Sequence, residues 1–169
     1  MTEDPSSLSR GQTNRAMRSF IAASGLWGIW GQTAGIGTAA FTGYALHLGA
    51  DESFIALFTS LAYVLALTQI LAPFLNAHIE QKKHFIVGLG SIEILLRGCI
   101  VFIPFLFPSE QRLMAMVCLL GASMFCGHGV SPFYGTWVAN AVPENIRARF
   151  TSRQTILSTI TAMMSGFAI

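Results

Sequence analysis

The chain has 169 residues, of which 53% are hydrophobic and only 11% are charged. A soluble domain usually carries about 25% charged residues, so this composition argues against an ordinary soluble fold and indicates lipid-facing helices. The formal net charge of +2 and the absence of a basic block give no sign of nucleic-acid binding. Cys99, Cys118 and Cys126 lack CxxC spacing and a nearby His pair, so we predict no disulfide, metal site or cofactor.

Long apolar stretches account for most of the sequence. Residues 20–50, 53–79 and 113–143 contain no Asp, Glu, Lys or Arg, and residues 84–109 are apolar apart from Glu93 and Arg97. About 20 residues suffice for a helix to cross a bilayer core of about 30 Å. Because backbone groups inside a bilayer must be satisfied internally, we predict an all-α, multi-span transmembrane helical bundle.

In chain order, we expect a cytoplasmic tail at 1–17 and a transmembrane helical domain at 18–169. The predicted spans run at about 18–48, 53–79, 84–107, 112–141 and 150–169. The first is too long for the ~7–15-residue apolar core of a cleaved signal peptide, so we interpret it as a retained helix. The last rises only about 24 Å from Gln154 to Ile169, so we expect an incomplete span and a longer protein.

The basic residues predict the orientation of these helices. Eight of the ten fall on one side of the predicted membrane, namely Arg10, Arg15, Arg18, Lys82, Lys83, Arg147, Arg149 and Arg153. Loops rich in Lys and Arg stay in the cytoplasm. We therefore expect a multi-pass protein of the cell (inner) membrane with a cytoplasmic N-terminus.

The first predicted span combines small residues with one amide. Gly31, Gly35, Ala39 and Gly43 follow one another at intervals of four, a spacing that lets a second helix approach closely. Gln32 lies close to this stripe. Its amide can bind a substrate in a central polar cavity, or it can simply bridge two helices.

The third predicted span contains two charges near mid-bilayer. Glu93 and Arg97 are separated by four residues, with the acid first, which is the favourable order for a pair on one helix face. An intramembrane charge costs at least ~2.5 kcal/mol. We predict an ion pair that is either purely structural or a proton-carrying or gating element.

The fourth predicted span contains the remaining candidates for a polar cavity. His128 and Ser131 share a helix face, Tyr134 follows, and Pro132 is expected to loosen the helix between them. Loosened helices near the midplane form binding sites in transporters. His128 can contact a substrate or carry a proton, or it can hydrogen-bond a neighbouring helix.

No GxSxG, P-loop, HExxH or CxxC motif is present, so we do not expect an enzyme. The segment Val142-Pro-Glu-Asn-Ile-Arg-Ala-Arg-Phe150 resembles the Pro-Glu-x-x-Arg-Gly-Arg segment between helices 4 and 5 of major facilitator superfamily transporters. Ala148 replaces the usual glycine. The loop at 76–84 retains only the basic end of that family's helix 2–3 motif, at Lys82 and Lys83. The arrangement of spans and basic loops is similar to the family's amino-terminal half.

This resemblance implies secondary active transport of a small solute by alternating access, with this chain as part of the transporter. It implies a missing carboxy-terminal half, contacts with membrane lipids and a coupling proton or ion. Helices 1 and 4 line the cavity in this family, which favours Gln32, His128, Ser131 and Tyr134 as cavity residues. Cytoplasmic gating residues would be Arg147, Arg149, Lys82 and Lys83. The alternative is a small accessory or assembly protein that dimerises through the glycine stripe.

Overall fold

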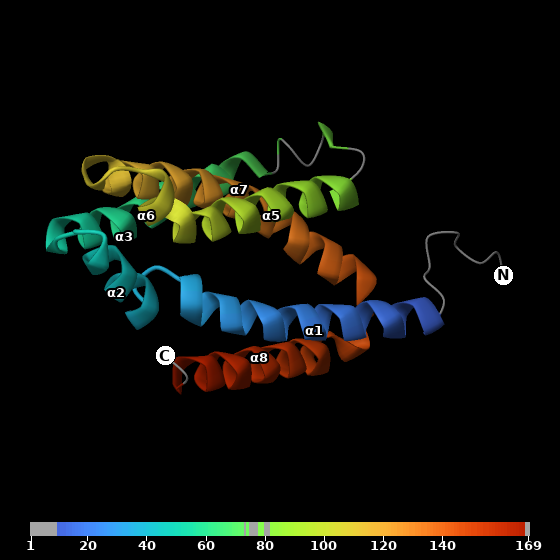
Figure 1. Cartoon of the computed structure of the whole chain (residues 1–169). Coiled ribbons are helices and arrows are strands. Elements are labelled where there is room, and N and C mark those ends of the chain that lie inside the picture. The colour runs from blue at the N-terminus through green and yellow to red at the C-terminus, as the bar shows by residue number, and fades with distance from the viewer. Residues whose placement is uncertain (1–9, 73, 75–77, 80–81, 168–169) are drawn as a thin grey trace. The chain divides into compact units, whose positions relative to one another are not determined.

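The computed structural model describes residues 10–72, 74, 78–79 and 82–167, apart from the side chains of residues 10, 12, 13 and 141. This part of the chain consists of helices joined by short turns and contains no β-strand, which confirms the all-α class (Figure 1). The elements are α1 (Arg10–Ala34), α2 (Ala39–His47), α3 (Glu52–Ala66), η1 (Leu67–Leu71), α5 (Lys82–Cys99), η2 (Ile100–Phe102), α6 (Ile103–Leu106), η3 (Ser109–Gln111), α7 (Arg112–Ala141) and α8 (Glu144–Phe167).

Within the described residues, three helical runs are long and apolar enough to cross a membrane. They are Glu52–Leu71, Lys82–Leu106 and Ser109–Asn140. These runs match the second, third and fourth predicted spans, although part of 72–79 lies outside the described residues. The fourth continues through Pro132 as one helix. The helical bundle with possible membrane spans is thus confirmed.

The prediction of one helix over 18–48 is wrong, because the chain turns between α1 and α2. Gly37 has a φ of +82°, a left-handed conformation that glycine adopts without steric cost. Thr38 then starts α2 as its N-cap, with Oγ1 accepting from Phe41 N. The predicted stripe from Gly31 to Gly43 is therefore divided between two helices. α1 also begins earlier than predicted, at Arg10.

The last helix and the basic segments also differ from the prediction. α8 begins at Glu144, directly after Pro143, six residues before the expected start at 150. An acidic residue in the first turn favours a helix start at this point. Arg147 and Arg149 accordingly lie on α8, and Lys82 and Lys83 on the first turn of α5, rather than in loops.

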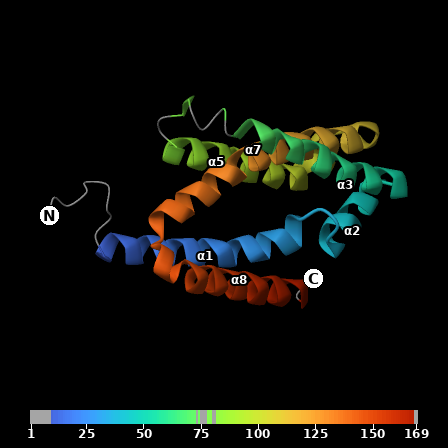
Figure 2. The ribbon, with the colours of Figure 1, turned by 180° about the vertical axis from the view of Figure 1, so that it is seen from behind.

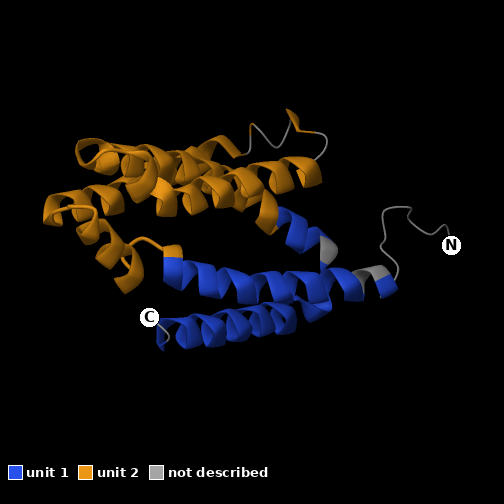
Figure 3. Cartoon of the chain, in the orientation of Figure 1, with its two compact units in different colours: residues 1–33, 136–169 blue, residues 34–135 orange. Residues whose placement is uncertain are grey.

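The chain forms two compact units (Figure 3). Unit 2, residues 34–135, contains α3, α5 and most of α7, which lie side by side in both views (Figures 1 and 2). Its apolar core includes Phe58, Ile103, Met116 and Leu120, all fully buried. Phe41 of α2 packs edge-on against Phe58 with ring centroids 5.6 Å apart.

Two prolines of unit 2 leave backbone carbonyls without their usual helical donor, and side chains supply the missing hydrogen bonds. Pro104 has no N–H for the Ile100 carbonyl, and Tyr44 Oη donates to that oxygen at 2.8 Å. Pro108 likewise cannot donate to the Pro104 carbonyl, and Arg112 Nη2 donates there at 3.1 Å. Both side chains therefore stabilise the irregular end of the Lys82–Leu106 run.

Unit 1, the described residues of 1–33 and 136–169, pairs α1 with α8, and Figure 2 shows the two helices side by side. The two helices approach closely at Gly28, because a Cβ there would overlap Ser158 O and Thr161 Oγ1. Thr161 Oγ1 donates to Gly25 O at 2.8 Å, and Gln154 Nε2 donates to Ser24 Oγ at 2.9 Å. Close backbones and interhelical hydrogen bonds are the interactions that hold helices together in lipid.

Candidate functional site

The predicted ion pair forms within α5. Arg97 Nη2 lies 3.5 Å from Glu93 Oε1, and the two side chains are 14% and 9% exposed. Because the residues are one helical turn apart, the helix itself holds both groups on one face. The pair is therefore internally neutral and almost completely removed from the surface of unit 2.

Helix α7 supplies a third member that sequence reasoning missed. Ser123 is fully buried, and its Oγ accepts a hydrogen bond from Arg97 Nε at 3.2 Å. The same hydroxyl donates to the backbone oxygen of Glu93 at 3.1 Å. Ser123 therefore connects both charged residues to α7, so that the pair bridges two long apolar helices.

Gly127, one turn after Ser123, makes room for the carboxylate. A Cβ at this position would lie 2.6 Å from Glu93 Oε1 and 2.7 Å from Glu93 Cδ. Any side chain would consequently displace the acid from its present position. Two positions of α7, one turn apart, thus accommodate the Glu93–Arg97 pair of α5. Ser123 hydrogen-bonds both residues of the pair, and Gly127 leaves room for the Glu93 carboxylate.

A second polar contact joins α7 to η1. Gln69 Nε2 lies 3.1 Å from His128 Nδ1. An amide nitrogen only donates hydrogen bonds, so Nδ1 accepts and the neutral ring carries its proton on Nε2. His128 also interacts with the backbone of Ala62. The structure therefore places His128 in a hydrogen bond to a neighbouring helical segment, which was one of its two interpretations.

The remaining predicted cavity residues are more dispersed. Ser131 is exposed and Tyr134 is half-buried, both on α7 in unit 2. Gln32 is exposed on α1 and belongs to unit 1. Two groups of polar side chains in unit 2 lie on its long helical runs, Glu93–Arg97–Ser123 and Gln69–His128. We call the two groups together the polar cluster.

The predicted gating residues differ from one another in their surroundings. Arg147 Nη2 donates to Ala139 O at 2.8 Å, and this carbonyl is the one that Pro143 leaves without a helical donor. Arg147 therefore stabilises the end of α7. Arg149, Lys82 and Lys83 are exposed.

The polar cluster can in principle change state in two ways. The Glu93 carboxylate can take up a proton, or the Arg97 guanidinium can exchange its carboxylate partner for another acceptor, since Ser123 still binds it. Within the described residues, no group of three or more His, Cys, Asp or Glu side chains could hold a metal ion.

Comparisons with known proteins find no matching family model, no matching curated protein and no matching solved structure.

Proposed function

We propose that this chain is part of a secondary active transporter of the major facilitator type, moving a small solute by alternating access. The observation that carries this proposal is the buried Glu93–Arg97 pair, bridged by Ser123 between two helices long enough to span a membrane. Ionisable residues inside membrane helices are costly and mark transport pathways or gating elements.

In this proposal the two parts of the polar cluster have different tasks. Gln69 and His128 present an amide and an imidazole at the accessible end, because Gln69 is exposed and His128 half-buried. Such groups fix the orientation of a polar solute. Glu93 and Arg97 act as the gating element, whose pairing is broken or re-formed as the solute site changes access.

The alternative of a dimerising accessory protein has less support. It requires the small residues from Gly31 to Gly43 to form one helix face. The turn at Gly37, with its φ of +82°, divides these residues between α1 and α2. No feature of the polar cluster needs a second copy of the chain.

We expect the loss of the His128 side chain to impair solute flux. In cells that produce the native protein, comparison of metabolite pools with and without its gene identifies the transported solute. Replacing His128 by Ala removes the imidazole that this proposal assigns to solute binding. The loss of one hydrogen bond to the solute costs ~0.5–1.5 kcal/mol, so flux of that solute should fall by up to about 10-fold. Flux is measured as initial uptake or efflux of the labelled solute.

The matched control is His47→Ala, since His47 is exposed on α2 and lies outside the polar cluster. This variant should retain normal flux. The transporter proposal would be contradicted if cells with the gene contained the protein in their membrane and yet had the same solute pools as cells without the gene.

A further inference from the structure

One exposed face of α8, beside the face that contacts α1, has a basic end and a long apolar body. Its exposed members recur at intervals of three or four and are Arg149, Arg153, Ile156, Ile160, Met163 and Phe167. This spacing places them in one stripe along the helix. The residues that contact α1, among them Gln154 and Thr161, lie on another face. The stripe has no polar residue beyond Arg153.

We propose that this stripe is a binding site for an anionic phospholipid. Arg149 and Arg153 bind the phosphate of the headgroup, and the apolar residues from Ile156 to Phe167 contact the acyl chains. Arginine is suited to the phosphate because its planar guanidinium forms paired, charge-assisted hydrogen bonds. This proposal does not rest on the transport proposal, since a phospholipid can bind whatever the helices carry.

The length of the stripe agrees with one leaflet of a bilayer. From Ile156 to Phe167 the helix rises about 16 Å, and half of the bilayer core is about 15 Å. The arginines lie one to two turns further toward the basic end of the helix, at the depth of the headgroups. The cytoplasmic leaflet holds the anionic lipids of a cell membrane, and the charge pattern predicts that this end of α8 is cytoplasmic.

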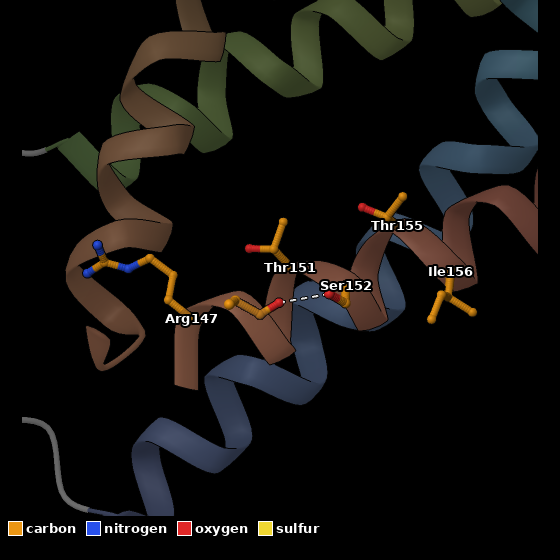
Figure 4. A pocket seen from close by; sticks show the side chains of 6 residues that line it. Arg147, Thr151, Ser152, Thr155 and Ile156 are labelled. Carbon is orange, nitrogen blue, oxygen red and sulfur yellow. Dashed lines mark hydrogen bonds between the residues drawn. The ribbon is translucent and has the colours of Figure 1, made fainter. Parts of the chain in front are cut away.

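An open groove beside the stripe provides further polar contacts. It has a volume of about 680 Å³ and is lined by Arg147, Ala148, Thr151, Ser152, Thr155 and Ile156. In Figure 4 the Thr151 and Thr155 side chains lie on the same side of α8, whereas the Arg147 guanidinium points away from them. The hydroxyl groups are suited to the glycerol and phosphate oxygens of a headgroup. Arg147 instead donates a hydrogen bond to Ala139 O at the end of α7.

The charges on α8 favour a lipid over a second copy of the chain. A parallel copy would place Arg149 and Arg153 against the same two residues of its partner, and this repulsion would oppose dimerisation. Glu144, at the start of the helix, is the sole acidic residue of α8. A phosphate, in contrast, complements both arginines.

The test compares lipid binding by the full chain in nanodiscs that contain either phosphatidylglycerol or only phosphatidylcholine. Retained lipid is counted by native mass spectrometry. We expect the native chain to retain phosphatidylglycerol. The apparent affinity for this lipid should fall about 30-fold in the Arg149→Gln/Arg153→Gln variant, since each basic residue near an anionic lipid surface contributes about 1 kcal/mol. Lys82→Gln/Lys83→Gln is the matched control, because it removes two exposed basic residues from another helix.

Each further result decides for or against this site. Retention of phosphatidylglycerol by an Arg149→Lys/Arg153→Lys variant supports the site. This variant keeps both positive charges, and its binding of lipid shows that the substituted protein folds. Equal losses of phosphatidylglycerol binding in Arg149→Gln/Arg153→Gln and in Lys82→Gln/Lys83→Gln would overturn the site in favour of unspecific charge attraction. Displacement of the lipid by inorganic phosphate alone would indicate a free-phosphate site, and a dimer without lipid would assign the stripe to a second copy.

Discussion

Replacing Glu93 by Gln alone is expected to lower the amount of folded protein in the membrane severely. The substitution removes the anion that lies 3.5 Å from Arg97 and leaves a guanidinium that is mostly buried between α5 and α7. Breaking a buried ion pair by removing one partner costs ~3–5 kcal/mol. This is a large part of a typical folding stability of ~5–15 kcal/mol. The measurement is the fraction of detergent-solubilised protein that remains monodisperse.

The second change in this experiment is Arg97→Gln in the same chain. With both charges removed, no unpaired ion remains, and the two amides retain hydrogen-bonding capacity, so most of the folded protein should return. Glu110→Gln serves as control, because Glu110 is an exposed acid on η3. A double variant as poor as the single one would show that the pair depends on a further charged partner.

Replacing either of two glycines of α1 by Ala is expected to change the stability of the protein in opposite directions. A Cβ at Gly28 would overlap backbone and side-chain atoms of α8, whereas a Cβ at Gly31 would have no atom within 4 Å. Gly28→Ala therefore forces the helices apart, which costs ~1–3 kcal/mol when packed atoms are displaced. Gly31→Ala should be neutral or stabilising by up to ~1 kcal/mol, since alanine favours helix more than glycine does.

These two variants differ only in position, so each is the control for the other. Thermal unfolding in detergent is the measurement, followed by aggregation. Gly25→Ala should fall between them, because the side chain that it meets, Leu157, is flexible. Equal melting temperatures for Gly28→Ala and Gly31→Ala would refute the close α1–α8 contact.

The parts of the fold that followed from the sequence are those set by uninterrupted hydrophobicity. The runs Lys82–Leu106 and Ser109–Asn140 were predicted to within a few residues, because their apolar lengths fit a bilayer. The turn at Gly37 was missed, because glycine occurs both in tight helix contacts and in left-handed turns. Thr38 could have indicated a new helix start, since threonine is a favoured N-cap. A threonine caps a helix only where the chain has turned before it, however, and the sequence did not reveal the turn at Gly37.

The candidate site was predictable only within a single helix. The spacing of Glu93 and Arg97 determines their contact, since both lie on α5. The contributions of Ser123 and Gly127 depend on how α7 is rotated and shifted against α5, and that register is a property of packing. Gln69 was missed for the same reason, because its contact with His128 is made across 59 positions of the chain.

The central claim is that the long apolar helices of unit 2 cross a membrane in the predicted orientation. Single cysteines at Glu52 and Lys82 test it in intact cells, after removal of the native cysteines. Both positions are exposed, and Glu52 is preferable to Asp51, whose Oδ1 accepts the capping hydrogen bond from Phe54 N. A membrane-impermeant maleimide should label the cysteine at 52 and reach that at 82 only after permeabilisation. Labelling at 82 in intact cells, with or without labelling at 52, would contradict this topology.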